Sequence, residues 1–471
     1  MITLVGLRNN LLLIVVGLYL LLNDGFMQVR IPPTAGLGIP VGELVLMFSI
    51  LTIKYDILLE RISSIINLLP FVIWWSIGLS HVILAVPEYG FWAFRDANHV
   101  IESLFLIVAF TFSEHQQMLE KFFNWLKKIS IIVCIYTLGY PFSETLKSLS
   151  PQLIAGAGYE MPLLFNYGDT SSALLIVASF YLIFSSSHIV LYLVAIFLLG
   201  FTIFIFQART IYLQIIAVSL LLLTYRSGSF LRVIIMIIVL AGFLATMPIV
   251  GFQFKGRLRE VSLDFMINHF LAIGGIENEG VEGAARGVPQ RLGWWSDLYE
   301  RWTSDARTFV FGLGYGFPLI NFRQHEGITV REPHNSYISI MARLGLLGSL
   351  AFIWMHTLLL RVWYRTYRAY RRMGWQEGEN RLLILLMFSV LLWISAIGED
   401  AFEKPYWTIP YYFFWGIVLR MNWRLGNNLL YSSVRFVTTN SESHSKGRFR
   451  YRSGLFINGR SNDPNGIGDI L

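Results

Sequence analysis

The sequence predicts an all-α protein that crosses a membrane many times. Of its 471 residues, 55% are hydrophobic and only 14% are charged, and the mean hydropathy is +0.56. Apolar runs long enough to cross a bilayer, roughly 17 to 25 residues with their flanks, recur along almost the whole chain. These observations favour a polytopic bundle of about twelve transmembrane helices and exclude an ordinary soluble domain.

The expected spans follow one another closely, apart from one long interruption between the ninth and the tenth. The first run is followed by Asn23-Asp-Gly-Phe instead of a small-residue cleavage site, so we expect it to be retained as a span. The interruption, residues 251–334, is expected to form a large loop subdomain. The expected spans are residues 9–23, 36–53, 66–86, 98–113, 129–142, 171–185, 188–206, 209–225, 231–250, 335–360, 382–398 and 406–420.

The distribution of Lys and Arg predicts the orientation of these spans. With both termini in the cytoplasm, basic residues concentrate in the inner segments, and the loop of residues 251–334 lies on the periplasmic face. The run from Arg361 to Arg372 fits an inner stop-transfer cluster better than the alternative, a binding site for anionic membrane lipids. The short outer connections hold only five basic residues, which are Arg30, Arg95, Lys147, Arg209 and Lys404.

Residues 1–425 are expected to form one membrane-embedded domain that includes the 251–334 loop. Residues 426–471 are expected to form a disordered, basic cytoplasmic tail, because the sequence turns polar after Asn422. The single cysteine, Cys134, excludes an intramolecular disulfide. We find no internal repeat, which argues against a transporter with inverted halves without excluding one. No nucleic-acid partner is expected.

The stretch of residues 331–348 holds the main candidate for catalysis. Pro333 suits the first turn of a helix, Asn335 is a cap-type residue, and an apolar run follows. This pattern places His334 on the first turn of a membrane helix. The helix dipole there disfavours imidazolium and favours a neutral ring that accepts a proton near pH 7. The alternative is that His334 only caps the helix at the headgroup level.

Arg209 is a candidate for binding an anion. It stands in Gln207-Ala-Arg209, a very short outer connection, and opens the next apolar run. A helix N-terminus repels a cation by roughly 0.3 to 1 kcal/mol, so a bound anion best explains an arginine there. Snorkelling of the side chain to lipid phosphates is the alternative.

Arg291 is a second candidate of the same kind. Pro289 marks a helix start, and Arg291, Trp295, Leu298 and Trp302 recur at helical spacing and share one face. A helix lying on the membrane surface, with its tryptophans buried, would hold Arg291 toward an anionic headgroup. In the alternative, the apolar stripe packs on the spans and Arg291 is a solvated end residue.

The segment Phe311-Gly-Leu-Gly-Tyr-Gly-Phe-Pro318 superficially suggests a nucleotide-binding glycine loop. We reject this interpretation, because no βαβ unit surrounds the segment and the outer face lacks nucleotide sugars. The glycines are expected to let the chain turn tightly and approach helix ends on the outer face.

Taken in order, these features resemble the family of O-antigen ligases and polymerases: an arginine that opens a middle span, a long outer loop with Arg291-Leu-Gly-Trp-Trp, the Gly312-Leu-Gly-Tyr-Gly segment, and Pro-His334-Asn-Ser-Tyr. The specific motifs cover about residues 170–420. The resemblance implies a glycosyltransferase of the bacterial inner membrane. It would use an undecaprenyl diphosphate-linked glycan on the periplasmic face, with Arg209 and Arg291 binding the diphosphate and His334 as the catalytic residue. Arg343 departs from the family, in which an acidic residue is common.

The residues fit this chemistry independently. Two guanidiniums would stabilise the charge released onto the diphosphate, and His334 would accept the proton of the incoming hydroxyl, with inversion at the anomeric carbon. No metal and no cofactor are expected, because the outer loops show no metal-ligand spacing. Glu399 and Asp400 are expected to pair with Lys404 or nearby arginines, with orientation of a sugar hydroxyl as the alternative; Asn335 is a further supporting candidate.

The acceptor stays open, because a ligase acting on lipid A core and a polymerase extending a growing polysaccharide share their donor chemistry. The rival function is a transporter or flippase for a lipid-linked glycan. Few charged residues other than Arg343 are expected inside the spans, which favours a one-sided enzyme over alternating access.

Overall fold

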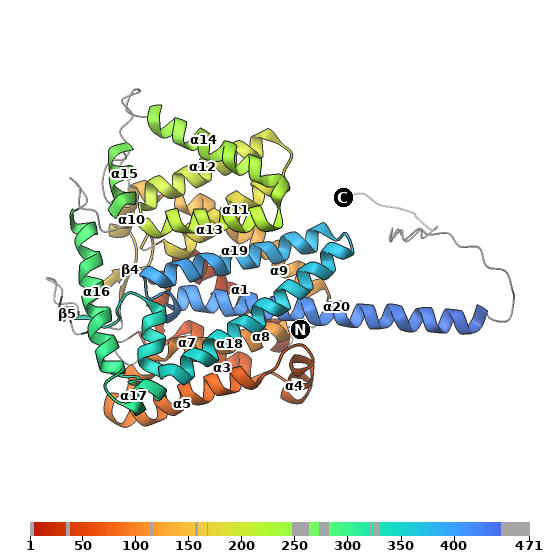
Figure 1. Ribbon diagram of the computed structural model, residues 1–471, viewed down its shortest axis with the longest axis horizontal. Helices are drawn as coiled ribbons and strands as arrows, with labels where there is room; N and C mark the ends of the chain where they lie inside the picture. Colours follow the sequence, from red (N-terminus) through yellow and green to blue (C-terminus); the bar gives the residue numbers. More distant parts are fainter. Residues whose placement is uncertain are drawn as a thin grey trace. The chain divides into compact units, whose positions relative to one another are not determined.

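The computed structural model describes residues 4–33, 38–112, 116–155, 159–166, 168–246, 263–272, 282–320, 322–323 and 329–443. This part of the chain is mostly helical (Figure 1). The chain divides into two compact units, Met1–Trp423 and Arg424–Leu471.

Each expected span coincides with helical structure, although several boundaries differ. The fourth expected span is broken into three short helices. The helix of the fifth expected span begins at Gln116, well before the expected residue 129. The helices are α1 Leu4–Leu22, α3 Val41–Leu51, α5 Leu69–Tyr89, α7 Asn98–Ile101 with η1 Glu102–Leu104 and α8 Phe105–Phe112, α9 Gln116–Thr137, α11 Asp169–Ser185, α12 Ile189–Phe206, α13 Arg209–Tyr225, α14 Phe230–Thr246, α18 Ser336–Arg372, α19 Gln376–Gly398 and α20 Pro405–Ser443.

Five of these helices are long and apolar enough to cross a membrane by themselves: α1, α5, α12, α18 and α19. A sixth candidate joins residues 118–137 to residues 140–148 across a bend of 41°. Helices α3, α11 and α13 are apolar but shorter. Among the described residues, the structure therefore supports a membrane protein with five or six clear spanning helices.

Short helices and three antiparallel strand pairs connect the long helices. The paired strands are β1 Arg30–Ile31 with β2 Ile39–Pro40, β3 Gln152–Ile154 with β4 Glu160–Pro162, and β5 Phe322–Arg323 with β6 Thr329–Val330. The short helices are α2 Asp24–Met27, α4 Tyr55–Ser63, α6 Phe91–Asp96, η2 Tyr140–Phe142, α10 Ser143–Ser148, η3 Ser227–Ser229 and η5 Ala401–Glu403.

The long loop of residues 251–334 contains three helices in its described part: α15 Leu263–Leu271, α16 Glu282–Trp302 and α17 Ala306–Phe311. Residues 251–262 and 273–281 lie outside the described part. Helix α16 runs across the ends of several long helices (Figure 1). It begins seven residues before Pro289, so the expectation that Pro289 starts the helix is wrong.

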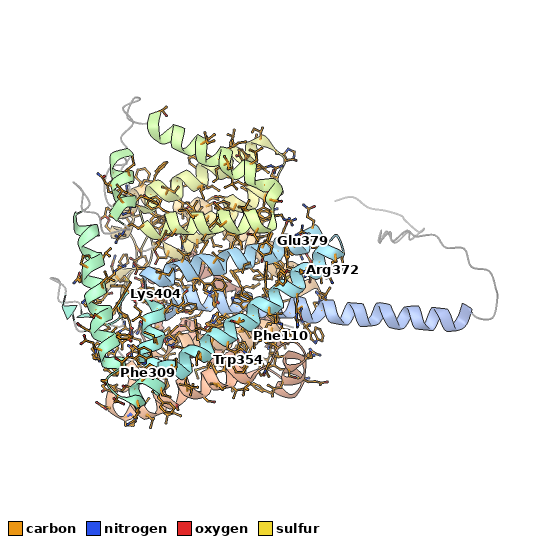
Figure 2. The ribbon with its side chains drawn as sticks, viewed as in Figure 1. Phe110, Phe309, Trp354, Arg372, Glu379 and Lys404 are labelled. Carbon is orange, nitrogen blue, oxygen red and sulfur yellow. The ribbon has the colours of Figure 1, made fainter. Side chains whose placement is uncertain are left out.

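The two ends of the bundle differ in their side chains. Lys404 lies at the end beside α16, whereas Arg372 and Glu379 lie at the opposite end (Figure 2). At that opposite end, Arg226 pairs with Glu379 at 3.3 Å, and Arg381 pairs with Glu120 at 2.6 Å. Ion pairs thus join α13 and α9 to α19 there.

Helix α18 is broken where the glycine segment meets it. Gly345 has φ 66°, and the backbone N–H groups of Leu313 and Gly314 donate to the carbonyls of Ala342 and Arg343 at 2.7 and 2.9 Å. The segment therefore satisfies carbonyls that the break frees from the helix. The expected close approach to helix ends is confirmed for Gly316, which lies against Tyr89, the last residue of α5, while Gly312 approaches the break inside α18.

The C-terminal tail was expected to lack structure from residue 426. Helix α20 instead continues to Ser443. Residues 444–471 lie outside the described part, so the expectation for them stays a prediction.

Candidate active site

Helix α18 begins at Ser336, and Asn335 is its N-cap. The Asn335 side-chain oxygen accepts hydrogen bonds from the backbone N–H groups of Tyr337 and Ile338 at 3.0 and 3.1 Å. His334 therefore precedes the cap, with a left-handed backbone at φ 53°, and does not lie on the first turn as expected. Asn335 supports the site by fixing where the helix begins.

His334 faces two carboxylates from the connection between α19 and α20. Its Nδ1 lies 3.3 Å from Oδ2 of Asp400 and 3.6 Å from Oε2 of Glu399. The ring of Trp294 from α16 lies beside it, with 6.2 Å between the ring centroids. The fold therefore brings together three site residues that the sequence singled out separately.

The carboxylates decide the protonation of His334. Burial by itself lowers the pKa of the imidazole, but Asp400 and Glu399 outweigh burial and raise the pKa to about 9. The expectation of a ring kept neutral by the helix dipole is wrong for this structure. Two nearby negative charges exceed the effect of a helix end, which is typically below 1 kcal/mol.

Arg291 reaches the same two-carboxylate connection from α16. Its NH1 donates to the carbonyl of Gly398 at 2.8 Å, and its NH2 lies 3.8 Å from Oε1 of Glu399. On the same helix, Trp295 Nε1 donates to the carbonyl of Pro333 at 2.9 Å. Helix α16 thus positions Arg291 and also contacts the backbone of Pro333, the residue before His334.

The apolar stripe of α16 packs on the protein. Leu298 is 1% exposed and clusters with Leu319, Ile320 and Ala342, the last of which belongs to α18. This agrees with the first half of the alternative interpretation from the sequence. The second half is wrong, because Arg291 bonds to Gly398 and faces Glu399 and is not a free, solvated end residue.

Arg209 is the first residue of α13, as the sequence predicted. Its NH1 donates to the carbonyl of Ala272 at 2.8 Å. The positive charge of Arg209 is repelled by Arg291 and attracted by Glu399. The three side chains are therefore close enough to interact electrostatically. A Cβ placed on Gly398 would lie 3.7 Å from Thr210 and 3.8 Å from Arg291, which shows how closely α13, α16 and the end of α19 approach.

Lys404 was not singled out as a site residue, yet it contacts the centre of the cluster. Its Nζ lies 3.5 Å from Oε2 of Glu399. Burial favours protonation of Glu399, but Lys404, His334 and Arg291 outweigh it and lower the pKa of this carboxyl to about 2. The expected pairing of Glu399 with Lys404 and an arginine is confirmed, whereas a role in orienting a sugar stays a prediction.

The backbone around the site is fixed by buried polar contacts. Ser336 donates to Oε2 of Glu403 at 2.6 Å and accepts from the backbone N–H of Phe402 at 2.9 Å. Burial, Asp400 and Glu332 raise the pKa of Glu403 to about 8. These contacts join the start of α18 to the 399–404 connection.

Arg343, whose partner the sequence left unknown, pairs with Glu332 and with Asp96 of α6, the latter at 3.2 Å. Asp96 also pairs with Arg331 at 3.0 Å and accepts from the backbone N–H of Gly316 at 3.1 Å. This network ties the residues just before His334 to the glycine segment. Spacing along the sequence could not reveal it, because Asp96 lies in a distant element.

A further buried polar cluster lies among α3, η1 and α20. Glu102 is fully buried, accepts a hydrogen bond from Thr408, and its charge interacts with that of Glu43. His99 and Arg420 are also buried. Glu43 and Glu102 therefore place two carboxyl groups inside the expected spans, and the expectation that few charged residues other than Arg343 lie there stays a prediction.

In the described residues, no group of three or more His, Cys, Asp or Glu side chains is placed to hold a metal ion. Metal independence stays a prediction. Comparisons with protein-family models and with curated proteins found no match to this chain. The resemblance to O-antigen ligases and polymerases therefore depends on the quoted motifs alone.

Proposed function

We propose that this protein is a membrane glycosyltransferase that transfers a glycan from undecaprenyl diphosphate to the hydroxyl of an acceptor sugar. One observation carries the proposal: Arg291 and His334, chosen from separate parts of the sequence, meet at Glu399, and the charge of Arg209 acts on the same group. A cluster rich in cations beside a histidine suits a diphosphate leaving group.

The reaction breaks the bond between the anomeric carbon and the diphosphate oxygen and forms a bond to the acceptor oxygen, with inversion. Arg209 and Arg291 stabilise the charge that develops on the departing undecaprenyl diphosphate. His334 accepts the acceptor proton at Nε2, while Asp400 and Glu399 stabilise the resulting imidazolium from the Nδ1 side. No metal ion takes part in this scheme.

The proposal includes the membrane arrangement: about twelve spans, both termini in the cytoplasm, and the site on the periplasmic face of a bacterial inner membrane. The positive-inside distribution of Lys and Arg supports this orientation. The short helices α3, α11 and α13 count as spans in this arrangement because packing against neighbouring helices compensates for their length.

A reconstituted reaction tests the function. Purified protein in nanodiscs, a polyprenyl diphosphate-linked glycan and an acceptor glycan should give transferred product. His334→Ala should lower turnover by roughly two to four orders of magnitude while leaving donor affinity nearly unchanged. If His334→Ala retains wild-type turnover, the assigned base is incorrect.

An experiment in cells would identify the acceptor. A deletion strain that accumulates long lipid-linked polymer without attached surface glycan would identify a ligase, whereas single lipid-linked repeats would identify a polymerase. A gel of surface polysaccharide distinguishes these outcomes.

The buried carboxyl pair of Glu43 and Glu102 favours one second candidate, a flippase for lipid-linked glycans, because ionisable groups inside a membrane bundle are often part of transport pathways. Movement of labelled lipid-linked glycan across liposomes by the purified protein, without glycan transfer, would favour this candidate.

A further inference from the structure

Helix α18 has a continuous exposed face that changes from apolar to basic along its length. In the middle of the helix this face holds Leu350, Ile353 and Trp354, which are 53%, 60% and 41% exposed. At steps of three or four residues, the same face continues through Thr357 into a row of exposed arginines. Figure 2 labels Trp354 in the apolar part and Arg372 at the far end of the helix. The arginines of this row are Arg361, Arg365, Arg368 and Arg372.

The protein itself does not neutralise the charges of this row. Within the part of the chain that the structure describes, none of the four guanidinium groups forms a hydrogen bond or an ion pair. Arg368 lies over the ring of Tyr364, at 5.7 Å from the ring centroid, a contact that does not use its N–H groups. The carboxylates of α19 at this end are engaged elsewhere, Glu377 with Arg381 and Glu379 with Arg226. The row therefore has donors and positive charge available for an external anion.

Two contacts fix the depth of the row relative to neighbouring helices. Trp363 Nε1 donates to the carbonyl of Leu382 at 2.8 Å, and Leu382 is where the expected span of α19 begins. The hydroxyl of Tyr367 donates to the carbonyl of Tyr225, the last residue of α13, at 3.2 Å. Neighbouring spans therefore end level with Trp363 and Tyr367, which is where the arginine row begins.

The rise of the helix decides which arginines reach lipid headgroups. At about 1.5 Å per residue, Arg361, Arg365 and Arg368 lie within roughly 8 Å of the level of Trp363 along the helix axis, whereas Arg372 lies about 13 Å beyond it. The headgroup layer of one leaflet is roughly 5–8 Å thick, and an arginine side chain can extend along it. The first three arginines therefore lie at headgroup depth, and Arg372 extends into water.

The phosphate groups of anionic phospholipids match this row in charge and geometry. A guanidinium group is weakly hydrated and binds phosphate oxygens through two parallel N–H bonds. Side chains three or four residues apart on a helix are neighbours, so two arginines can contact one headgroup. The stop-transfer role that the sequence favoured needs positive charge, but it does not require that the charge continue a lipid-facing apolar stripe.

We propose that Arg361, Arg365 and Arg368 form a binding site for anionic glycerophospholipids of the phosphatidylglycerol type. The headgroup phosphate binds the arginines, and the acyl chains lie along the apolar part of the same face. The site lies at the end of the bundle opposite the candidate active site (Figure 2). This inference does not depend on the proposed glycosyl transfer, because it involves neither His334 nor Arg291.

Fluorescence quenching by labelled lipids tests the site. A fluorophore on Thr357→Cys, in a Cys134→Ser background, reports lipid on the exposed face one turn before Arg361. The full chain is reconstituted in phosphatidylcholine vesicles that contain increasing fractions of spin-labelled phosphatidylglycerol or spin-labelled phosphatidylcholine. The ratio of the two quenching efficiencies gives the preference for the anionic headgroup. We expect a preference of roughly fivefold or more at low ionic strength, which falls towards one at about 1 M salt.

Matched variants assign this preference to the row. Arg361→Gln/Arg365→Gln should bring the preference close to one, because each arginine at the membrane surface contributes roughly a fivefold attraction. Arg361→Lys/Arg365→Lys keeps both charges and should retain most of the preference, which separates loss of charge from damage to the helix. Lys127→Gln/Lys128→Gln, which removes two exposed charges from α9, should leave the preference unchanged.

Three results would overturn the site. They are a wild-type preference near one, an undiminished preference in the double glutamine variant of α18, and an equal decrease in the α9 control. A loss in the double lysine variant as large as in the glutamine variant would also overturn it, because charge would then not be the cause.

Discussion

His334 owes its properties to residues far away in the sequence. Its Nδ1 faces Asp400 and Glu399, so the ring holds a proton in the free protein at neutral pH. A histidine of this kind is a strong base once it is neutral, but only a small fraction of it is neutral at pH 7.

This protonation predicts the pH dependence of transfer. As the pH rises toward about 9, more His334 loses its proton, so kcat/KM should increase and then level off. Asp400→Asn removes negative charge, lowers the pKa of His334, and should move the plateau to lower pH. Glu144→Gln, which changes an exposed carboxylate, should leave the profile unchanged. A rate that is flat below pH 9 and falls above it would instead mean that imidazolium is the active form.

In the proposed reaction, Arg291 should act on both donor binding and rate, because its charge is needed most when the diphosphate leaves. Arg291→Ala should raise the donor Kd and lower kcat by at least tenfold each. Arg291→Lys should recover only part of this loss, because lysine lacks the planar fork. Steady-state kinetics and donor titration measure both effects. Arg307→Ala, an exposed arginine of α17, is the control, and an equal effect there would point to bulk surface charge.

Among the elements, α18 and α16 do most to position the site. The break in α18 at Gly345 admits the glycine segment, and Trp295 of α16 holds the backbone of Pro333. The start of α18 is therefore fixed by its cap and by the contact with α16, and the glycine segment holds the helix further along, at its break.

Gly345 should tolerate no side chain. A Cβ there would lie 2.4 Å from the backbone N of Gly312 and 2.5 Å from the carbonyl oxygen of Val310, in addition to the positive φ. Gly345→Ala should destabilise the protein by roughly 2–4 kcal/mol, from backbone strain and overpacking together. Gly374→Ala, with φ 68° and open space around it, should cost only about 1 kcal/mol. Melting temperatures in detergent compare the two, and equal losses would show that the contact with the glycine segment is unimportant.

On the scale of the whole molecule, the bundle has two chemically different ends. The end beside α16 holds Lys404 and the candidate site, and the other end holds Arg372 (Figure 2). If the positive-inside distribution sets the topology, these ends face opposite sides of the membrane.

Cysteine labelling tests this topology in a Cys134→Ser background. Ser304→Cys, which follows α16, should react with a membrane-impermeant maleimide added to the periplasmic side. Met373→Cys, at the exposed connection between α18 and α19, should react only after the inner membrane is permeabilised. The reverse pattern would refute the orientation and the periplasmic location of the site.

The sequence alone determined the features that depend on local composition. Hydrophobic runs gave helices at all the expected positions, because burying apolar side chains dominates the choice of structure in a lipid environment. Helical spacing on α16 correctly gathered Trp295, Leu298 and Trp302 on one packed face. Asn335 was correctly recognised as a cap-type residue, although the helix was expected to begin before it.

Only the tertiary structure decided which charges meet. Asp96 pairs with Arg343, and Asp400 and Glu399 face His334, although these partners lie in elements far apart along the chain. Electrostatic effects depend on distance in space and on burial, and neither can be read from sequence spacing. For this reason the sequence singled out His334 as a candidate but predicted its protonation wrongly. It also missed the buried carboxyl pair of Glu43 and Glu102, which forms only where several helices converge.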